Sequence, residues 1–318
     1  MEKEKVKYHP RNWSQYNKSL VARGSLTLWV NDEVLNQWYH LSKNNKPGRN
    51  NLYSDLAIQC AIQIKSLYQL PFRAVQGFLI SLFAVMELNI KVPDYSTICR
   101  RMKNLRVKLK YNKKDKIEHL AIDASGLKVY GEGEWKTRQH GWSKRRTWRK
   151  IHVGIDAQSQ EIVCCELTYN KINDQEMFEY CLSQVKSDIV QVSADGIYDT
   201  ENCYKYSTQN KIKLTVPPRI TAISRFDKKN PDTHHFKMRD DNIQHIDCLG
   251  KKAWAEYSGY SKRSLVENTM FRFKQAFSGK LQSRKFLNQH TEFMIKCNIL
   301  NQFARMGMPN SIPIKKVS

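Results

Sequence analysis

The chain lacks several features that mark common classes of protein. Its longest nearly uninterrupted apolar run, residues 78–88, is about half of the roughly 20 residues that a bilayer-spanning helix requires. The first residues are polar and charged, without the apolar stretch of a secretory signal. None of the eight cysteines forms the C-x2-C pair of zinc sites. We therefore expect no membrane segment, a cytoplasmic location and reduced cysteines that fill the core.

Acidic residues are scarce relative to basic ones. The 318 residues include 53 Lys and Arg but 30 Asp and Glu, a formal net charge of +23. Such an excess favours a polyanionic partner, either nucleic acid or an anionic membrane surface. With 41% hydrophobic and 11% aromatic residues, the chain can bury a sizeable core, which excludes global disorder. The length predicts two domains, with one large domain as the alternative.

The first third of the chain is predicted to be helical. Residues 1–52 are expected to form an arm, helical over 26–41, and a polar linker. Within residues 53–116, apolar residues recur three and four positions apart, which predicts helices over 54–67 and 72–87. We therefore expect an all-helical N-terminal region.

A third helix, predicted over 96–110, is strongly basic. Nine Lys and Arg residues and one acid lie between Arg100 and Lys116. Two apolar helices and a short turn before a basic helix are typical of a helix-turn-helix-like module, whose last helix lies in the major groove. We expect Arg100 and Arg101 to bind DNA there. A helical bundle with a solvated basic face is the alternative.

Residues 117–307 show a different pattern, of strands and helices together. Three consecutive strands followed by alternating helices and strands predict a mixed α/β sheet. The expected strands cover 119–122, 149–155, 161–167, 189–194 and 212–216. The expected helices cover 174–186, 200–209, 262–278 and 287–306, with a linker over 219–259 and a polar tail over 308–318.

Two aspartates each follow an apolar stretch directly. Asp123 ends Leu-Ala-Ile-Asp and Asp195 ends Val-Ser-Ala-Asp. Polar groups at the carboxyl ends of strands line the functional crevice of open α/β sheets. If the strands are neighbours, the carboxylates repel unless a hard cation such as magnesium separates them or one is protonated. Taken singly, an Asp in such a position is more often a turn or helix cap.

A third acid lies on a predicted helix. Tyr260, Arg263, Glu267 and Lys274 are three, four and seven residues apart, so at about 100° per residue they share a stripe about 60° wide. The adjoining face is apolar, with Val266, Met270, Phe273 and Phe277. The helix can thus bury one face and present a carboxylate between cations that bind phosphates. A surface helix with local ion pairs is the alternative.

These residues carry a family resemblance. The stripe fits a Y-x2-R-x3-E-x6-K signature, and with Asp123 and Asp195 upstream the chain resembles bacterial insertion-sequence transposases of the DDE class. The stretches Asp-Ala-Ser-Gly-Leu-Lys-Val-Tyr and Asp-Gly-Ile-Tyr-Asp, which begin at these two aspartates, are similar to the family's first and second acid motifs. The resemblance covers about residues 53–309. It implies a ribonuclease H-like mixed-sheet catalytic core with an all-helical N-terminal DNA-binding region, and Asp123, Asp195 and Glu267 as a catalytic, metal-binding triad.

A second basic segment follows the first acid motif. Residues 136–150 hold seven Lys and Arg residues, no acid and two tryptophans. Basic residues interleaved with aromatic ones can hold phosphates and stack on unpaired bases. The DNA contacts expected here are Trp142, Lys144, Arg145 and Arg146. An exposed basic hairpin is the alternative.

The combined pattern leads to a mechanistic hypothesis. Two magnesium ions, replaceable by manganese, would be held by the three acids, and water would free a 3′-hydroxyl at a terminal inverted repeat. That hydroxyl would then attack target DNA. Arg263 and Lys274 would bind backbone phosphates, and Tyr260 would position the strand. The resemblance implies double-stranded DNA as partner and a dimer or larger synaptic complex. The alternatives are a non-catalytic DNA-binding regulator or defunct copy, and a metal nuclease that cuts without joining.

Overall fold

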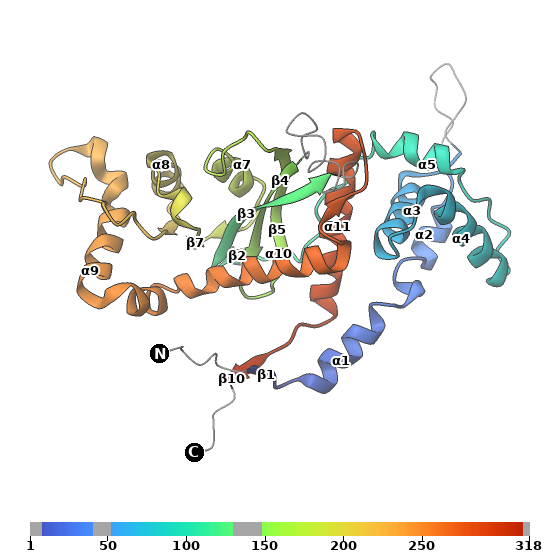
Figure 1. Cartoon of the computed structure of the whole chain (residues 1–318), viewed down its shortest axis with the longest axis horizontal. Helices are drawn as coiled ribbons and strands as arrows, with labels where there is room; N and C mark the ends of the chain where they lie inside the picture. Colours follow the sequence, from blue (N-terminus) through green and yellow to red (C-terminus); the bar gives the residue numbers. More distant parts are fainter. Residues whose placement is uncertain (1–7, 41–51, 130–147, 314–318) are drawn as a thin grey trace, which may run out of the picture.

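A six-stranded sheet forms the centre of the computed structural model, which describes residues 8–40, 52–129 and 148–313 (Figure 1). Five strands lie in the order β5-β4-β3-β7-β8, and β9 pairs with the last residues of β3. The strands are β3 (Leu120–Val129), β4 (Trp148–Asp156), β5 (Ile162–Tyr169), β7 (Gln191–Ser193), β8 (Lys213–Thr215) and β9 (Lys280–Leu281).

The directions of the strands define the fold. Strands β3, β4 and β5 form an antiparallel meander, with Ala121 opposite Ile155. Strand β7 lies parallel to β3, and β8 lies parallel to β7. Three antiparallel strands followed by parallel strands reached through helices make a ribonuclease H-like mixed α/β core. The predicted mixed sheet is confirmed.

Helices cover both faces of this sheet. Successive residues of a strand point to opposite faces, so Leu120 and Ile122 pack in the same cluster as Phe178, while Ala121 packs in the cluster that holds Phe273. Burial on both faces explains why the start of β3 is a continuous apolar run. The helices after the meander are α7 (Met177–Ser183), α8 (Glu201–Gln209), α9 (Lys237–Tyr257), α10 (Ser264–Phe277) and α11 (Phe286–Met306).

Short elements complete the core. They are the pair β2 (Lys116–Ile117) and β6 (Asp188–Ile189), and the 3-10 turns η3 (Gly196–Tyr198), η4 (Pro231–Phe236) and η5 (Tyr260–Arg263). Near the two ends of the chain, β1 (Tyr8–Pro10) pairs antiparallel with β10 (Ser311–Pro313). None of the helices in the described residues is long and apolar enough to cross a membrane.

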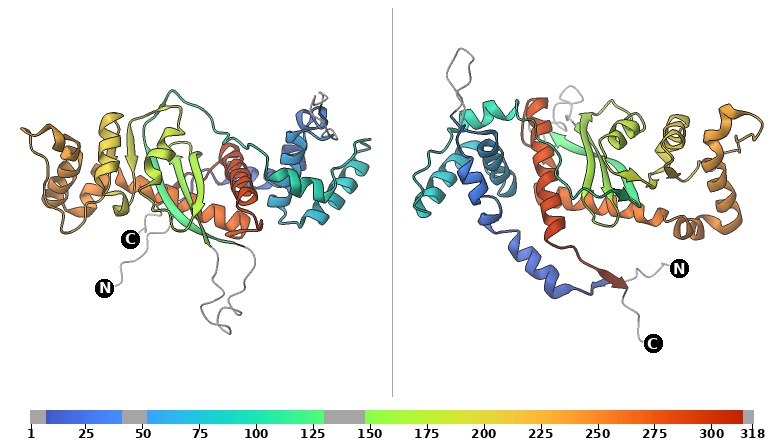
Figure 2. Two further views of the ribbon diagram at one scale, coloured as in Figure 1. Left: turned by 90° about the horizontal axis from the view of Figure 1, so that it is seen from above. Right: turned by 180° about the vertical axis from the view of Figure 1, so that it is seen from behind.

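The N-terminal helices lie beside the sheet, with α11 standing between them (Figures 1 and 2). They are α1 (Trp13–Ala22), η1 (Leu26–Leu28), α2 (Asp32–Asn36), α3 (Asp55–Leu67), α4 (Phe72–Val85) and α5 (Tyr95–Met102). Ile64 of α3 belongs to the same hydrophobic cluster as Phe293 of α11 and Ile151 of β4. The hydrophobic core is therefore continuous across the domain boundary that we place at residue 116.

The basic helix is shorter than predicted. Helix α5 ends at Met102 rather than at residue 110. From 105 to 109 every second residue is apolar and packs on the core, a period typical of extended backbone. Asn298 of α11 holds this backbone, since it accepts from the Lys110 N–H (2.7 Å) and donates to the Lys108 carbonyl (2.9 Å). The packing partner α11 thus decides the local conformation.

The prediction of a linker over 219–259 is wrong from residue 237 onward, because helix α9 begins there. This 21-residue helix is interrupted at Gly250, whose φ of 78° is left-handed. Trp254 anchors the helix, since its indole is fully buried and donates to Asn242 Oδ1 (3.1 Å). Most of the remaining helix surface is polar, so apolar periodicity does not reveal it.

Two further predictions need correction. The helix expected over 26–41 is instead the turn η1 and the short helix α2, with α1 before them. Strand β3 does not end at Asp123 but continues to Val129, because its residues up to Lys128 pair with β4. Asp123 therefore lies inside a strand, where its backbone is held by the ladder.

Candidate active site

Asp123 lies on β3, and Asp195 follows the end of the neighbouring strand β7 by two residues. In the parallel pair of β3 and β7, Ala121 is opposite Ser193, so the two aspartates follow at the same distance along each chain. Asp123 is half-buried and its Oδ1 accepts from the Ala124 N–H (2.8 Å). Asp195 Oδ1 accepts from the Ile197 N–H (2.9 Å) and caps η3. The helix-cap interpretation of Asp195 and its place beside Asp123 are thus compatible.

Arg263 joins the third acid to this pair. Its Nη1 donates to Asp123 Oδ2 (3.2 Å), and its Nη2 donates to Glu267 Oε1, one helical turn further along. Two turns beyond Glu267, Lys274 Nζ donates to the hydroxyl of Ser125 on β3 (2.7 Å). The stripe predicted from helical spacing therefore faces β3, and a cation lies between the carboxylates of β3 and α10.

Tyr260 departs slightly from the predicted stripe. It lies in the 3-10 turn η5 before α10, and its ring centroid is 5.8 Å from the Arg263 guanidinium carbon. Its other neighbour is the buried ring of Trp254, 5.0 Å away. Burial raises the pKa of Tyr260 above its ordinary value, so the side chain stays a neutral hydroxyl that can donate a hydrogen bond.

Asp123 holds its proton unusually tightly. Burial, followed by the negative charges of Asp195 and Glu267, raises its pKa to about 6 against the Ala124 N–H and Arg263, which lower it. Asp123 therefore feels the charges of the other two carboxylates. Mutual repulsion of this kind is what a bound cation relieves.

The donor set has the chemistry of a site for hard cations. Three carboxylates, without thiolate or imidazole, are oxygen ligands of the type that magnesium and manganese prefer. Within the residues that the structure describes, no group of three or more His, Cys, Asp or Glu is already gathered closely enough to hold a metal ion. The Arg263 guanidinium fills the position between Asp123 and Glu267 instead. The ligand types fit, and a metal would replace this bridge.

The other predicted DNA contacts divide into three groups. Arg100 is exposed on α5. Arg101 is largely buried, because it donates to the Tyr53 carbonyl and to Asp55 and so ties α5 to α3. The remaining four lie outside the described residues and stay predictions: Trp142, Lys144, Arg145 and Arg146.

Comparison with protein-family models assigns the chain to a family. Two family models, each described as a transposase DDE domain, match residues 21–132 and residues 114–302, and the second match alone spans more than half of the chain. This chain belongs to the DDE transposase domain family. Members of that family typically catalyse phosphoryl transfer.

Solved structures with similarity to the DDE domain include integrases and a transposase. The catalytic core domain of BIV integrase is 13% identical, with 56% of this chain and 91% of that chain covered and a TM-score of 0.21. An intasome of simian T-cell lymphotropic virus is 10% identical over 61% and 66% of the two chains, with a TM-score of 0.23. The piggyBac transposase in a synaptic complex with hairpin DNA is 11% identical over 94% and 84%, with a TM-score of 0.26. At these TM-scores, the fold assignment rests on the strand order of the sheet.

Sequence reasoning missed the residues that support the second acid motif of the DDE domain. Asp199 is almost fully buried and accepts from Arg239 Nε (3.0 Å) and from the Tyr204 hydroxyl (3.1 Å). Arg239 belongs to α9, the helix that the sequence did not predict. This pair anchors α9 next to the loop that carries Asp195. The spacing of Asp195 and Asp199 is visible in the sequence, but the pairing of Asp199 with Arg239, 40 residues away, is not.

Replacing Asp123 by Asn should stabilise the DDE domain in metal-free buffer. Because the folded pKa (about 6) exceeds the ordinary value of 3.8, the native state binds this proton more tightly than the unfolded state. Stability is therefore lost as the pH rises from about 4 to about 6 and stays low above that range. Removing the charge at pH 7.5 should recover up to about 3 kcal/mol, since one pKa unit is about 1.4 kcal/mol.

Urea unfolding with EDTA at pH 7.5 and pH 5 measures this effect. We expect the gain to shrink at pH 5, where wild-type Asp123 is already mostly protonated. Asp188→Asn, at an exposed acid of β6, is the matched control and should change little. A D123N variant that is less stable than wild type at pH 7.5 would contradict the conclusion that the buried Asp123 charge destabilises the fold.

Proposed function

We propose that the protein is a DNA transposase of the bacterial insertion-sequence kind, which cleaves at terminal inverted repeats and transfers the 3′-hydroxyl end into target DNA. The observation that carries the proposal is the Arg263 bridge between Asp123 and Glu267, beside the strand that leads to Asp195. It brings Asp123 and Glu267, which are far apart in the chain, together beside the interior strand β3, and Lys274 contacts the same strand at Ser125. Acids that hold metal next to cations that hold phosphate are what this chemistry requires.

Each side chain has a role that its environment supports. Asp123, Asp195 and Glu267 would hold two magnesium or manganese ions, which stabilise the attacking and leaving oxygens of phosphoryl transfer. Arg263, which now neutralises two carboxylates, is then available for a backbone phosphate, and guanidinium binds phosphate in a two-pronged manner. Lys274 projects from the same face of α10.

Tyr260 and the N-terminal helices would supply positioning and recognition. The neutral Tyr260 hydroxyl can donate to the DNA strand near the scissile bond. The helical region of residues 53–116 would recognise the inverted repeats. Because two ends must be joined in one event, the active form would be a dimer or larger synaptic complex on double-stranded DNA.

A single assay tests this proposal. Purified protein is incubated with magnesium, a labelled duplex carrying the element's inverted repeat, and supercoiled plasmid. Joined end-to-plasmid products are expected, and EDTA should remove them. Binding without nicking would identify a regulator or defunct copy, and nicking without joined products would identify a plain nuclease. Either result would overturn the transposase proposal.

A further inference from the structure

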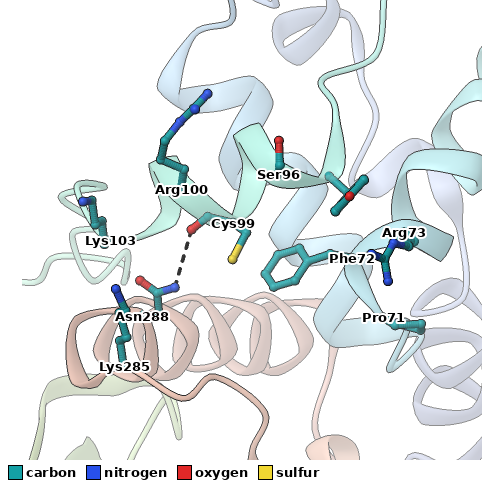
Figure 3. Close-up of a pocket in the computed structure, with 10 residues that line it drawn as sticks. Pro71, Phe72, Arg73, Ser96, Cys99, Arg100, Lys103, Lys285 and Asn288 are labelled. Atoms are coloured by element: carbon teal, nitrogen blue, oxygen red, sulfur yellow. Dashed lines mark hydrogen bonds between the residues drawn. The ribbon is translucent and has the colours of Figure 1, made fainter.

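A cationic groove lies between the N-terminal helices and the start of α11 (Figure 3). It consists of two adjoining cavities of about 720 and 640 Å³, and we refer to them together as the α5–α11 groove. The residues that line both cavities are Pro71, Phe72, Cys99, Lys285 and Asn288. Cavities of this size accommodate ligands of nucleotide size. The groove shares no residue with the carboxylate site.

The charge of the groove is of one sign. Its lining contains no acid and six cations, namely Lys65, Arg73, Arg100, Lys103, Arg284 and Lys285. Among the ion pairs of the described residues, none involves any of these six side chains. Glu292 acts on Lys65 and Asp94 on Arg100 through longer-range charge interactions, but neither acid lines the groove. A groove lined by cations and no acid favours a ligand with several negative charges.

Asn288 has an unsatisfied hydrogen-bond acceptor at the groove. The residue is 8% exposed, and its Nδ2 donates to the Cys99 carbonyl (3.5 Å; Figure 3). Its Oδ1 is buried and has no hydrogen-bond partner among the described residues. A buried acceptor of this kind requires a donor. Phosphate at neutral pH offers acceptors, whereas the edge of a nucleobase offers N–H donors.

Phe72 adds a surface for a base. The half-buried ring lines both cavities at the start of α4, and Lys65 Nζ lies 5.1 Å from its centroid. Aromatic rings between cations are the usual platforms on which unpaired bases stack. In a duplex the base faces are covered by their neighbours, so a platform of this kind suits a single strand.

We propose that the α5–α11 groove binds an unpaired DNA strand, with phosphates on its exposed cations and one base against Phe72 and Asn288. This inference rests on the proposed function in DNA end processing and deepens it, because it adds a strand-binding site outside the carboxylate centre. The displaced strand of an opened DNA end has the required chemistry. The groove also joins α5 to the catalytic core, so a bound strand would contact both.

Cysteine alkylation in the full-length protein tests the location. Cys99 and Cys248 are the two exposed cysteines among the eight, and Cys99 lines the groove while Cys248 lies on α9. A saturating single-stranded oligonucleotide in EDTA should slow maleimide modification of Cys99 about 10-fold or more and leave Cys248 unchanged, as read by peptide mass spectrometry. An unchanged Cys99 rate with the oligonucleotide bound, or equal protection by the matched duplex, would overturn the proposal.

Charge removal tests the phosphate-binding role of the exposed lysines. Lys103→Ala with Lys285→Ala should weaken single-strand binding and lower the slope of log K against log salt by about 0.7 for each phosphate that is no longer neutralised. Both lysines are exposed, so the fold should be unaffected. The matched control is Lys251→Ala with Lys252→Ala, two exposed lysines of α9, which should keep the wild-type slope. Equal slopes of log K against log salt in the two double variants would contradict the proposal that the groove binds phosphates.

The outcomes separate this inference from the proposed function. If the protein joins duplex ends but Cys99 stays unprotected by a bound strand, the transposase proposal stands and the groove proposal fails. If strands protect Cys99 but no end is nicked or joined, the groove stands as a binding site and the transposase proposal fails.

Discussion

Asp195→Asn should abolish joined products in the strand-transfer assay, with a loss of about 10³-fold or more. A carboxylate that holds a catalytic metal contributes several kcal/mol of transition-state stabilisation, and about 4 kcal/mol corresponds to 10³ in rate. The substitution is mild for the fold, because an Asn Oδ1 can still accept from the Ile197 N–H that Asp195 now caps. A loss of activity would therefore report on charge at the site.

A DNA-binding measurement and two further substitutions show whether the loss of activity is specific to the triad. DNA-end binding, measured by fluorescence anisotropy in EDTA, should remain close to wild type, because Asp195 carries no phosphate contact in the proposal. Asp188→Asn changes an exposed acid of the short strand just before β7 and should keep full activity. Full activity in Glu267→Gln would refute the assignment of the triad.

Lys296→Met should lower the free energy of unfolding by about 3–5 kcal/mol, the range observed when one partner of a buried ion pair is removed. Lys296 Nζ donates to Glu292 Oε1 (2.6 Å) and to the Lys280 carbonyl (3.0 Å), and both side chains are almost fully buried. Glu292 also accepts from the N–H groups of Gln282 and Ser283 (both 2.9 Å). Without Lys296, the Glu292 charge stays buried and loses its direct cationic partner, and only these N–H groups and the more distant charge of Lys65 offset it.

The pair also predicts a pH dependence. Burial alone would raise the pKa of Glu292, but the charge and hydrogen bond of Lys296, together with the Gln282 N–H and the charge of Lys65, outweigh burial and hold the pKa below its ordinary value. For an acid with a lowered folded pKa, the stabilisation is present above the unfolded pKa and is lost as the pH falls through the folded one. Urea unfolding should therefore show the difference between wild type and K296M at pH 7 and a smaller one in strong acid.

An exposed pair of the same spacing is the matched control. Lys205 and Glu201 on α8 are also four residues apart, at 2.6 Å, but both are about half exposed. Since exposed pairs of this kind contribute little, Lys205→Met should leave the unfolding midpoint almost unchanged. Equal effects of the two substitutions would contradict a special role of the buried pair.

Local periodicity explains which parts of the site were predictable. Glu267 and Lys274 are two turns apart at about 3.6 residues per turn, so the spacing alone placed them on one face of α10, and Arg263 continues this face from the preceding turn η5. The three-strand pattern before the crossover likewise predicted the mixed sheet. Where a local period was absent or ambiguous, prediction was wrong, as for the polar helix α9 and the extended segment after Met102.

The sequence by itself determined the strong basic excess, the order of the three acid motifs and the helix stripe that carries Glu267, because composition and periodicity are local properties. Only the tertiary structure decided which distant groups meet. It brought Arg263 to Asp123, directed Arg101 inward to Asp55 and set Asn288 against Cys99 in a cationic groove. These three contacts join residues between 46 and 189 positions apart, and such pairings depend on how strands and helices pack rather than on any local pattern.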